Sequence, residues 1–254
     1  MSDSFLCTLP SGGDAGVAVI LAGGFGTRIR HLLGDLPKPM LPVAGRPFLE
    51  WVVRYLVRQG VNRFVLSTGF RSEVVKRHFA DQPVKGIEVV CISETEPLGT
   101  AGGFLHAVER SGLDGSIWFV ANGDSLLLTD AFQQLRTTVQ QATTSSAILG
   151  LEVPDAGRFG SLRIAPDGEL ISFSEKRTGV GLINAGVYAF RRELLEAFPP
   201  VRPLSFETDV FPSLLARGYR IQVVDCLGAF LDIGTEESLA QAEGFIRNHD
   251  HWFY

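Results

Sequence analysis

The chain has 254 residues, a formal net charge of −5, and 45% hydrophobic and 20% charged residues, so it can bury a core as one α/β domain or two small ones. The acidic balance argues against a nucleic-acid partner, and no apolar run reaches the roughly 18 residues of a membrane span. With three widely spaced cysteines and no Lys or Arg before Arg28, a cytoplasmic protein without a signal peptide is expected.

The first half of the chain alternates predicted strands and helices. Residues 1–16 are rich in Ser, Gly and Asp and are predicted to form a disordered leader, and residues 17–254 a single domain. The predicted strands are Val17–Leu21, Phe64–Ser67, Ile87–Ile92 and Ile117–Ala121, and the predicted helices are Pro47–Gln59, Ser72–Phe79 and Thr100–Arg110. Apolar runs and helical spacing support these assignments. Their order is typical of a Rossmann-like α/β fold with a mostly parallel sheet flanked by helices.

The second half of the chain predicts a mixed continuation of this sheet. The turn sequence Pro166-Asp167-Gly168 lies between two short apolar runs and therefore predicts a β-hairpin. The other predicted strands are Ala147–Val153, Ile183–Phe190 and Arg220–Val224, and the predicted helices are Glu207–Ala216 and Glu236–Arg247. Ligands of open parallel sheets bind beyond the carboxyl ends of the strands, so motifs directly after strands are the candidates for function.

A glycine-rich loop, Ala22-Gly23-Gly24-Phe25-Gly26-Thr27-Arg28, follows the first strand directly. Its glycines let the backbone approach a ligand closely, and phosphates suit the N–H groups of such a loop. The loop lacks the Gly-Lys-Ser/Thr end of a P-loop, and Ile29 occupies the position of the third Rossmann glycine. A plain strand-to-helix turn is the alternative.

A lysine between two prolines, Pro37-Lys38-Pro39, follows the glycine loop. The prolines stiffen the backbone and are expected to exclude a helix, so Lys38 would be held rigidly. Such a lysine is a good electrostatic partner for a phosphate. An ordinary surface lysine in a Pro-rich loop is the alternative.

Together, Leu21–Arg28 and Leu36-Pro37-Lys38-Pro39 resemble the signature of the sugar-phosphate nucleotidyltransferase family, and the resemblance continues to about Ile246. It implies the nucleotide-diphospho-sugar transferase fold. The implied catalytic residues are Arg28, Lys38 and Lys176. The implied nucleotide-binding residues are Leu21, Ala22, Gly23, Gly24, Gly26, Thr27, Gly99 and Thr100. An N-cap role is the alternative for Thr100.

Two further motifs place an aspartate where the family binds its metal. Asn122-Gly123-Asp124 ends a predicted strand, and Leu231-Asp232-Ile233-Gly234 precedes a predicted helix. By resemblance, Asp124 and Asp232 bind Mg²⁺, which takes oxygen ligands and also binds substrate phosphates. The alternatives are an Asx-type turn at Asp124 and a solvent-facing acid at Asp232.

The sugar side of the predicted site rests on the later motifs. The resemblance implies sugar contacts from Gly123, Glu175, Asn184, Gly186 and Glu207. Without it, Glu175 and Lys176 are a solvated pair and Glu207 compensates a helix dipole. His78, His106, His249 and His251 show no metal-ligand spacing and are predicted to be surface residues. The aromatic tail ending in Phe253 and Tyr254 leaves a homo-oligomer contact open.

The implied reaction joins a nucleoside triphosphate to a sugar 1-phosphate and releases pyrophosphate. A sugar phosphate is already nucleophilic, so positive charge and in-line positioning would supply catalysis. The segments around Ser161, Glu175, Asn184 and Glu207 look most like those of D-glycero-α-D-manno-heptose-1-phosphate guanylyltransferases, which implies GTP and this heptose phosphate as substrates.

Several other functions stay open from the sequence. Within the family, they are mannose-1-phosphate guanylyltransferase, N-acetylmuramate-1-phosphate uridylyltransferase, and glucose-1-phosphate thymidylyl- or uridylyltransferase. Outside it, they are a non-catalytic homologue that binds nucleotide sugars and an NAD-binding Rossmann protein. The missing third glycine argues against the last of these.

Overall fold

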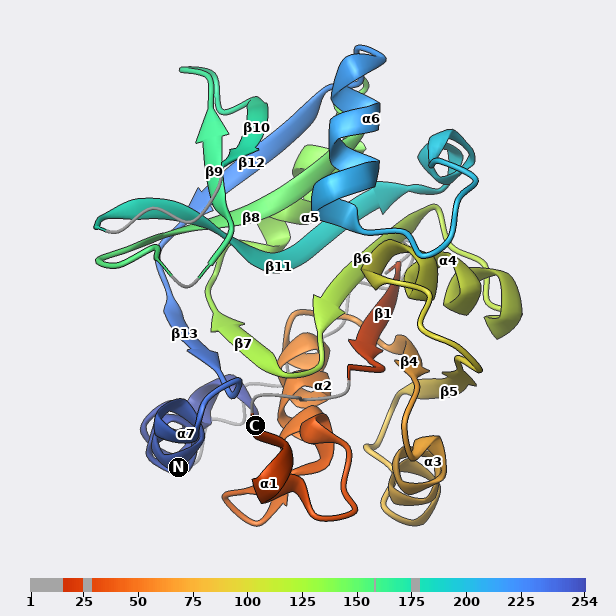
Figure 1. The fold of residues 1–254 in the computed structure, drawn as a ribbon, viewed down its shortest axis with the longest axis vertical. Helices are drawn as coiled ribbons and strands as arrows, with labels where there is room; N and C mark the ends of the chain where they lie inside the picture. The colour runs from red at the N-terminus through yellow and green to blue at the C-terminus, as the bar shows by residue number, and fades with distance from the viewer. Residues whose placement is uncertain (1–15, 25–28, 158, 175–178) are drawn as a thin grey trace, which may run out of the picture.

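The computed structural model describes residues 16–24, 29–157, 159–174 and 179–254 (Figure 1). The predicted leader therefore lies outside the described residues. A nine-stranded mixed sheet runs through the molecule in the order β10-β9-β11-β6-β1-β4-β5, with β8 pairing β11 and β12. Its strands are β1 (Val17–Ala22), β4 (Arg63–Thr68), β5 (Glu88–Ser93), β6 (Ile117–Asn122), β8 (Ser146–Val153), β9 (Ser161–Ile164), β10 (Leu170–Ser174), β11 (Gly181–Arg191) and β12 (Ile221–Cys226).

The two halves of the sheet differ in direction, as the sequence predicts. Strands β6, β1, β4 and β5 pair in parallel, whereas β11 is antiparallel to both β6 and β8. The predicted hairpin is confirmed, because β9 and β10 pair antiparallel around Pro166-Asp167-Gly168. The mixed α/β fold flanked by helices is thereby confirmed.

Helices cover both faces of the sheet (Figure 1). They are α1 (Arg30–Leu33), α2 (Phe48–Arg58), α3 (Ser72–Asp81), α4 (Thr100–Ser111), α5 (Phe132–Gln140), α6 (Phe211–Ala216) and α7 (Glu236–Asn248). Alternation along β1 divides the core into two clusters: Ala18 and Ile20 pack with α2 and α5, and Val17 and Val19 pack with α4 and α6. Burial on both faces explains the continuous apolar run of this strand.

A second, two-stranded sheet was not predicted, and it brings the two aspartate motifs together. β7 (Ser125–Leu128) continues directly from the Asp124 turn, and β13 (Ala229–Asp232) pairs with it antiparallel. Asp232 is the register partner of Ser125, and the Ile233 N–H donates to the Asp124 carbonyl at 3.0 Å. Figure 1 shows this pair on the side of the molecule that leads into α7.

The predicted helix 207–216 is present, but it begins with a π-helical turn (Phe206–Val210), and α6 follows that turn. Ser205 caps this turn by accepting hydrogen bonds from the N–H groups of Glu207 and Thr208. The prolines around Lys38 do not exclude a helix, because Lys38–Met40 forms a 3₁₀ turn with Pro39 in its first turn, where a missing N–H does no harm.

His78 was predicted to be a surface residue, but it is largely buried. Its side chain is only 11% exposed and hydrogen-bonds Glu50 at 2.8 Å. Glu50 of α2 is itself buried and also accepts from Arg46 and Arg54. The hydrogen bond between this carboxylate and His78 therefore joins α3 to α2, and the two arginines balance the charge of the carboxylate.

The aromatic tail packs on its own chain. Phe253 is buried with its ring centroid 5.1 Å from that of Trp51, and Trp252 packs on Tyr55. Phe253 is therefore not available to a partner, although Tyr254 remains exposed. Of the helices in the described ranges, none is long and apolar enough to cross a membrane.

Candidate active site

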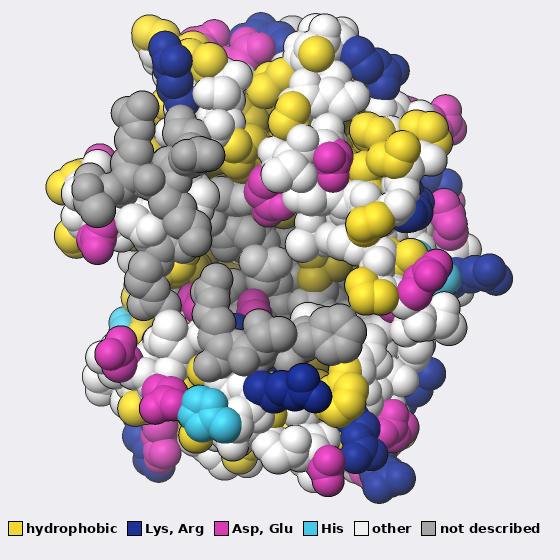
Figure 2. Space-filling view, in the orientation of Figure 1, with side chains coloured by type: hydrophobic (Ala, Val, Ile, Leu, Met, Phe, Trp, Pro, Cys, Tyr) yellow, Lys and Arg dark blue, Asp and Glu magenta, His cyan; other side chains and the backbone are white. Residues whose placement is uncertain are grey.

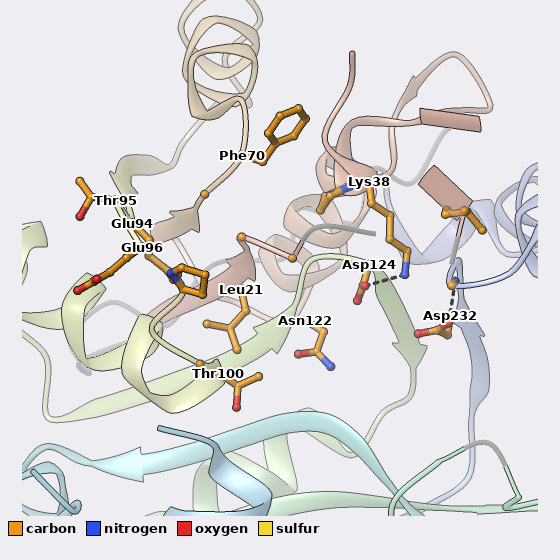
Figure 3. A pocket seen from close by; sticks show the side chains of 18 residues that line it. Leu21, Lys38, Phe70, Glu94, Thr95, Glu96, Thr100, Asn122, Asp124 and Asp232 are labelled. Carbon is orange, nitrogen blue, oxygen red and sulfur yellow. Dashed lines mark hydrogen bonds and ion pairs between the residues drawn. The ribbon is translucent and has the colours of Figure 1, made fainter. Parts of the chain in front are cut away.

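A pocket of about 810 Å³ lies beyond the carboxyl ends of the parallel strands, where the sequence predicts the site. Figure 2 shows the surface hollowed at the middle of this face, and Figure 3 shows the side chains that line the pocket. The lining residues are Leu21, Gly23, Gly24, Ile29, Lys38, Pro39, Gly69, Phe70, Glu94, Thr95, Glu96, Pro97, Gly99, Thr100, Asn122, Asp124, Asp232 and Gly234.

Lys38 and Asp124 form an ion pair in this pocket. The Lys38 Nζ donates to Asp124 Oδ2 at 2.7 Å (Figure 3). The lysine side chain is only 9% exposed and that of Asp124 is 35% exposed. An ammonium group so far removed from water requires an anionic partner, and Asp124 supplies it. The 3₁₀ turn that begins at Lys38 fixes the backbone from which this side chain reaches the pocket.

Asp232 lies across from this pair, at the end of β13. Its Oδ1 accepts a hydrogen bond from the Gly234 N–H at 2.7 Å. A Cβ at Gly234 would lie 2.5 Å from that oxygen and 3.3 Å from the Lys38 Nζ. Because residue 234 is a glycine, the Asp232 carboxylate and the Lys38 ammonium group can both lie close to the backbone at this turn.

The two aspartates fit a divalent cation. Among the described residues, Oδ1 of Asp124 and Oδ2 of Asp232 accept no hydrogen bond, so each carboxylate keeps one oxygen for another ligand. No group of three or more His, Cys, Asp or Glu side chains that could hold a metal forms in the described ranges. Two carboxylates with the remaining positions left to water and phosphate oxygens is the ligand set that suits Mg²⁺.

Glu94 is a pocket residue that the sequence did not predict. It is half-buried just after β5, where its Oε1 accepts from Ser67 Oγ at 2.9 Å and its Oε2 accepts from the Leu98 N–H at 3.3 Å. A Cβ at Gly23 would lie 3.2 Å from Oε1, so the carboxylate is adjacent to the glycine loop. An ionised carboxylate has about four acceptor positions, so Glu94 can accept further bonds from a ligand.

The Gly99-Thr100 loop is fastened to a distant segment. Gly99 has a φ of +78° and its Cα faces the Leu204 backbone so closely that a Cβ would lie 2.5 Å from the Leu204 carbonyl oxygen. That carbonyl accepts from the Ala101 and Gly102 N–H groups. Gly99, not Thr100, occupies the N-cap of α4. The N-cap alternative for Thr100 is therefore wrong, and its Oγ1 instead accepts from the Phe206 N–H.

The residues predicted to contact sugar form a hydrogen-bonded cluster beside the pocket. Tyr188 donates its hydroxyl to Glu207 Oε1 at 2.9 Å, and Asn184 Nδ2 donates to the Tyr188 hydroxyl at 2.7 Å. Burial and the Glu207 charge raise the pKa of Tyr188 well above its usual value, so this hydroxyl stays protonated. Glu207 also accepts from Ser205 Oγ.

Gly186 connects this cluster to the pocket. It has a φ of +72°, and a Cβ there would lie 2.2 Å from Nδ2 of Asn122, which lines the pocket. Asn184, Gly186 and Glu207 themselves are not among the lining residues. Gly186 therefore lies directly behind Asn122, and Asn184 and Glu207 lie beside the pocket.

Apart from Asn184, Gly186 and Glu207, the predicted site residues fall into three groups. Those that line the pocket are Leu21, Gly23, Gly24, Lys38, Gly99, Thr100, Asp124 and Asp232. Ala22 and Gly123 lie directly beneath it and contact each other, since a Cβ at Gly123 would lie 3.3 Å from that of Ala22. The predictions for Gly26, Thr27, Arg28, Glu175 and Lys176 lie outside the described residues.

The residues that the sequence analysis missed are Glu94 and Phe70. Both follow strands directly, Phe70 two residues after β4 and Glu94 one residue after β5. Their position after parallel strands was the available signal.

Known proteins resemble this chain in sequence and in fold. A model of the nucleotidyl transferase family matches residues 17–249. The mannose-1-phosphate guanylyltransferase of Mycobacterium tuberculosis is 33% identical over 234 residues, which are 91% of this chain and 62% of that protein, so the chain spans less than two thirds of its length. The D-glycero-alpha-D-manno-heptose 1-phosphate guanylyltransferase of Campylobacter jejuni is 32% identical over 222 residues, 87% of this chain and 95% of that protein.

A solved structure agrees over nearly its whole length. HddC from Yersinia pseudotuberculosis, complexed with GMP-PN, superposes with a TM-score of 0.77 at 33% identity and covers 91% of this chain and 99% of that one. The fold is therefore that of the nucleotide-diphospho-sugar transferases. Because the family match includes every described element from β1 to α7, the chain belongs to the nucleotidyl transferase family and is an enzyme of the nucleotidyltransferase class.

Proposed function

We propose that this enzyme transfers GMP from GTP to D-glycero-α-D-manno-heptose 1-phosphate, forming GDP-heptose and releasing pyrophosphate. The observation that carries the chemistry is the buried Lys38–Asp124 ion pair with Asp232 opposite, in a pocket at the ends of parallel strands. The heptose assignment is supported by the Campylobacter relative and by one from Aneurinibacillus thermoaerophilus, of which the chain covers 95% and 99%.

Glu94 supports guanine as the base. A triphosphate pocket gains nothing from a half-buried carboxylate near the phosphates, but such a carboxylate matches the guanine edge. Guanine presents two adjacent donors, N1–H and the N2 amino group, and one carboxylate can accept from both. Uracil, thymine and adenine each present a single donor beside acceptor atoms, which a carboxylate repels.

The reaction requires no general base. An oxygen of the sugar phosphate attacks the α-phosphorus, and the bond from that phosphorus to the bridging oxygen breaks as pyrophosphate leaves. Lys38 would lie against the reacting phosphates, where removal from water strengthens its charge. Asp124 holds that ammonium group in place through Oδ2.

Asp124 and Asp232 would hold Mg²⁺ through their remaining oxygens. When bound, this ion offsets phosphate charge and orients the phosphate oxygens. Arg28 is proposed to stabilise the triphosphate and Lys176 to hold the sugar phosphate. The proposed sugar contacts are Gly123, Glu175, Asn184, Gly186 and Glu207. We also propose a cytoplasmic location, in keeping with the sparse cysteines.

Mannose 1-phosphate is the second candidate sugar. The mycobacterial relative that acts on it is as similar in sequence as the heptose enzymes. The chain spans 62% of that protein and 99% of the Aneurinibacillus heptose relative.

Pyrophosphate release tests the proposal. The enzyme would be incubated with Mg²⁺, each of GTP, UTP, dTTP, CTP and ATP, and a panel of sugar 1-phosphates that includes heptose and mannose. The highest kcat/KM is expected for GTP with the heptose phosphate. Asp124→Asn should lower kcat by roughly 100-fold or more, because the variant loses charge at the reacting centre.

Asp225→Asn is the matched control, since Asp225 is exposed on β12 and does not line the pocket. It should leave kcat unchanged. Faster pyrophosphate release with GTP and mannose 1-phosphate would make mannose 1-phosphate the sugar substrate and leave the proposed type of reaction unchanged. Release with no pair of substrates would contradict the proposed reaction.

A further inference from the structure

Phe70 lines the pocket and has no role in the reaction described above. Phe70 is 46% exposed. The other phenylalanines in the described ranges are buried or pack against one of the two main core clusters. In Figure 3 no other labelled side chain of the pocket lies against the Phe70 ring. An aromatic ring exposed on the wall of a binding pocket offers an unused face to a ligand.

The backbone on the amino-terminal side of Phe70 is fixed by the glycine loop. Gly69 packs against Gly23 so closely that a Cβ on Gly69 would lie 2.9 Å from the Gly23 carbonyl oxygen. Gly23 in turn contacts Glu94. Phe70 therefore stands next to the same backbone that Glu94 adjoins, so both belong to one part of the pocket.

The backbone on the carboxyl-terminal side is fixed by Arg71. This residue adopts the left-handed conformation, with a φ of 55° and a ψ of 41°, which is unfavourable for a residue other than glycine. Its guanidinium pairs with Asp35 at 3.0 Å and with Glu73 at 3.5 Å. It also lies 5.9 Å from the centroid of the Phe70 ring. These contacts hold Phe70 in a defined orientation and give the ring a cationic neighbour.

We propose that Phe70 is the stacking surface for the nucleobase of the substrate. The inference rests on the proposed function, because it needs a nucleotide in this pocket. A planar base would lie with its face on the Phe70 ring while its edge meets Glu94. Stacking tolerates any base, since every base has a π-face. Phe70 would thus set the affinity for nucleotide, and Glu94 would set the choice of base.

Binding measured by isothermal titration calorimetry separates contact with the base from contact with the phosphates. The ligands are GTP and tripolyphosphate, each with Mg²⁺, and the proteins are the wild type, Phe70→Ala and Phe70→Tyr. Phe70→Ala should weaken GTP binding by roughly ten-fold, the effect of losing one base–aromatic stack, and should leave tripolyphosphate binding unchanged. Phe70→Tyr should bind GTP within about two-fold of the wild type, because it keeps the ring.

Leu227→Ala is the matched control, because Leu227 is 87% exposed and lies outside the pocket lining. It should bind both ligands as the wild type does. Equal weakening of GTP and tripolyphosphate in Phe70→Ala would overturn the proposal, as would unchanged GTP binding. Circular dichroism melting of each variant checks that the fold is intact.

A further titration distinguishes failure of the stacking role from failure of the proposed function. Each triphosphate of the activity panel would be titrated into the wild type and Phe70→Ala. If the wild type prefers a triphosphate with another base and Phe70→Ala binds that triphosphate more weakly, the stacking role stands and the guanine assignment is wrong. If the wild type prefers GTP and Phe70→Ala binds it equally well, only the stacking role falls.

Discussion

At the scale of single residues, the pocket combines groups of opposite charge that lie in different parts of it. Lys38 is buried beside Asp124, where a polyphosphate would need positive charge. Glu94 is held by Ser67 and Leu98 near Gly23, away from Lys38 in Figure 3. This separation supports the proposal that Lys38 serves the phosphates and Glu94 the base.

The variant Glu94→Gln tests whether Glu94 selects guanine as the base. The amide keeps the shape of the side chain, but it presents one acceptor and one donor where guanine requires two acceptors. We expect the ratio of kcat/KM for GTP to that for UTP to fall roughly 10- to 100-fold, the value of a hydrogen bond to a charged group. Steady-state kinetics with both nucleotides measure it. Glu88→Gln, at the exposed start of the same strand, should keep the wild-type ratio, and an unchanged ratio in Glu94→Gln would remove the basis for guanine.

At the scale of elements, ion pairs and short strands position the site from outside it. The Glu50 carboxylate on α2 pairs with Arg54 of the same helix, with Arg46 just before the helix, and with His78 of α3. Burial alone would raise the pKa of Glu50, but the hydrogen bonds from Arg54 and His78 and the charges of both arginines outweigh it and lower that pKa. The ionised carboxylate therefore favours the folded state.

Glu50→Gln should destabilise the fold and change its pH dependence. We expect the free energy of unfolding at pH 7 to fall by about 3 kcal/mol, since the arginines lose a buried partner. Because the folded pKa is lowered, the stabilisation is full above the ordinary value of 4.5 and is lost as the pH falls through the folded pKa. Urea unfolding between pH 3 and 7 measures both effects. Glu109→Gln, at an exposed position on α4, is the control and should behave as the wild type does. If Glu50→Gln and the wild type lose the same free energy of unfolding as the pH falls, this account is refuted.

At the scale of the whole molecule, the pocket is a place where ligand binding should stabilise the fold. A ligand at 100 times its Kd adds about 2.7 kcal/mol, which corresponds to roughly 5–10 °C in Tm for a domain of this size. We expect GTP with Mg²⁺ to raise the Tm of the wild type by this amount. Addition of EDTA should remove most of the shift, and Asp232→Asn should show little difference between the two conditions. A shift that EDTA leaves intact would argue against the aspartate metal site.

The sequence predicts the parallel half of the molecule well, because its signals are local. Continuous apolar runs mark β1, β4 and β6, and helical spacing marks α2 and α4 between them. Lys38, Asp124 and Asp232 come from three separate motifs and line one pocket. The assignment of Asp232 depended on family resemblance, because the pairing of β13 with β7 joins segments far apart in the chain and leaves no local pattern.

The missed features are those decided by tertiary contacts. Glu94 reads as an exposed acid in a polar loop, and only its bonds to Ser67 and Leu98 fix it in the pocket. Thr100 satisfies the rules for an N-cap, but the Leu204–Phe206 segment recruits its hydroxyl and leaves Gly99 to begin the helix. Such choices depend on neighbours that no window of sequence contains.

The pairing of β7 with β13 also determines when the enzyme becomes competent during its synthesis. A ribosome that has released the chain through β12 has already supplied the glycine loop, Lys38 and Asp124, but not Asp232. The nascent chain at that stage has one carboxylate of the proposed pair and an unpaired β7 edge. The proposed site is therefore completed only after β13 has been synthesised, and products terminated before β13 would lack the second carboxylate however well their parallel half had folded.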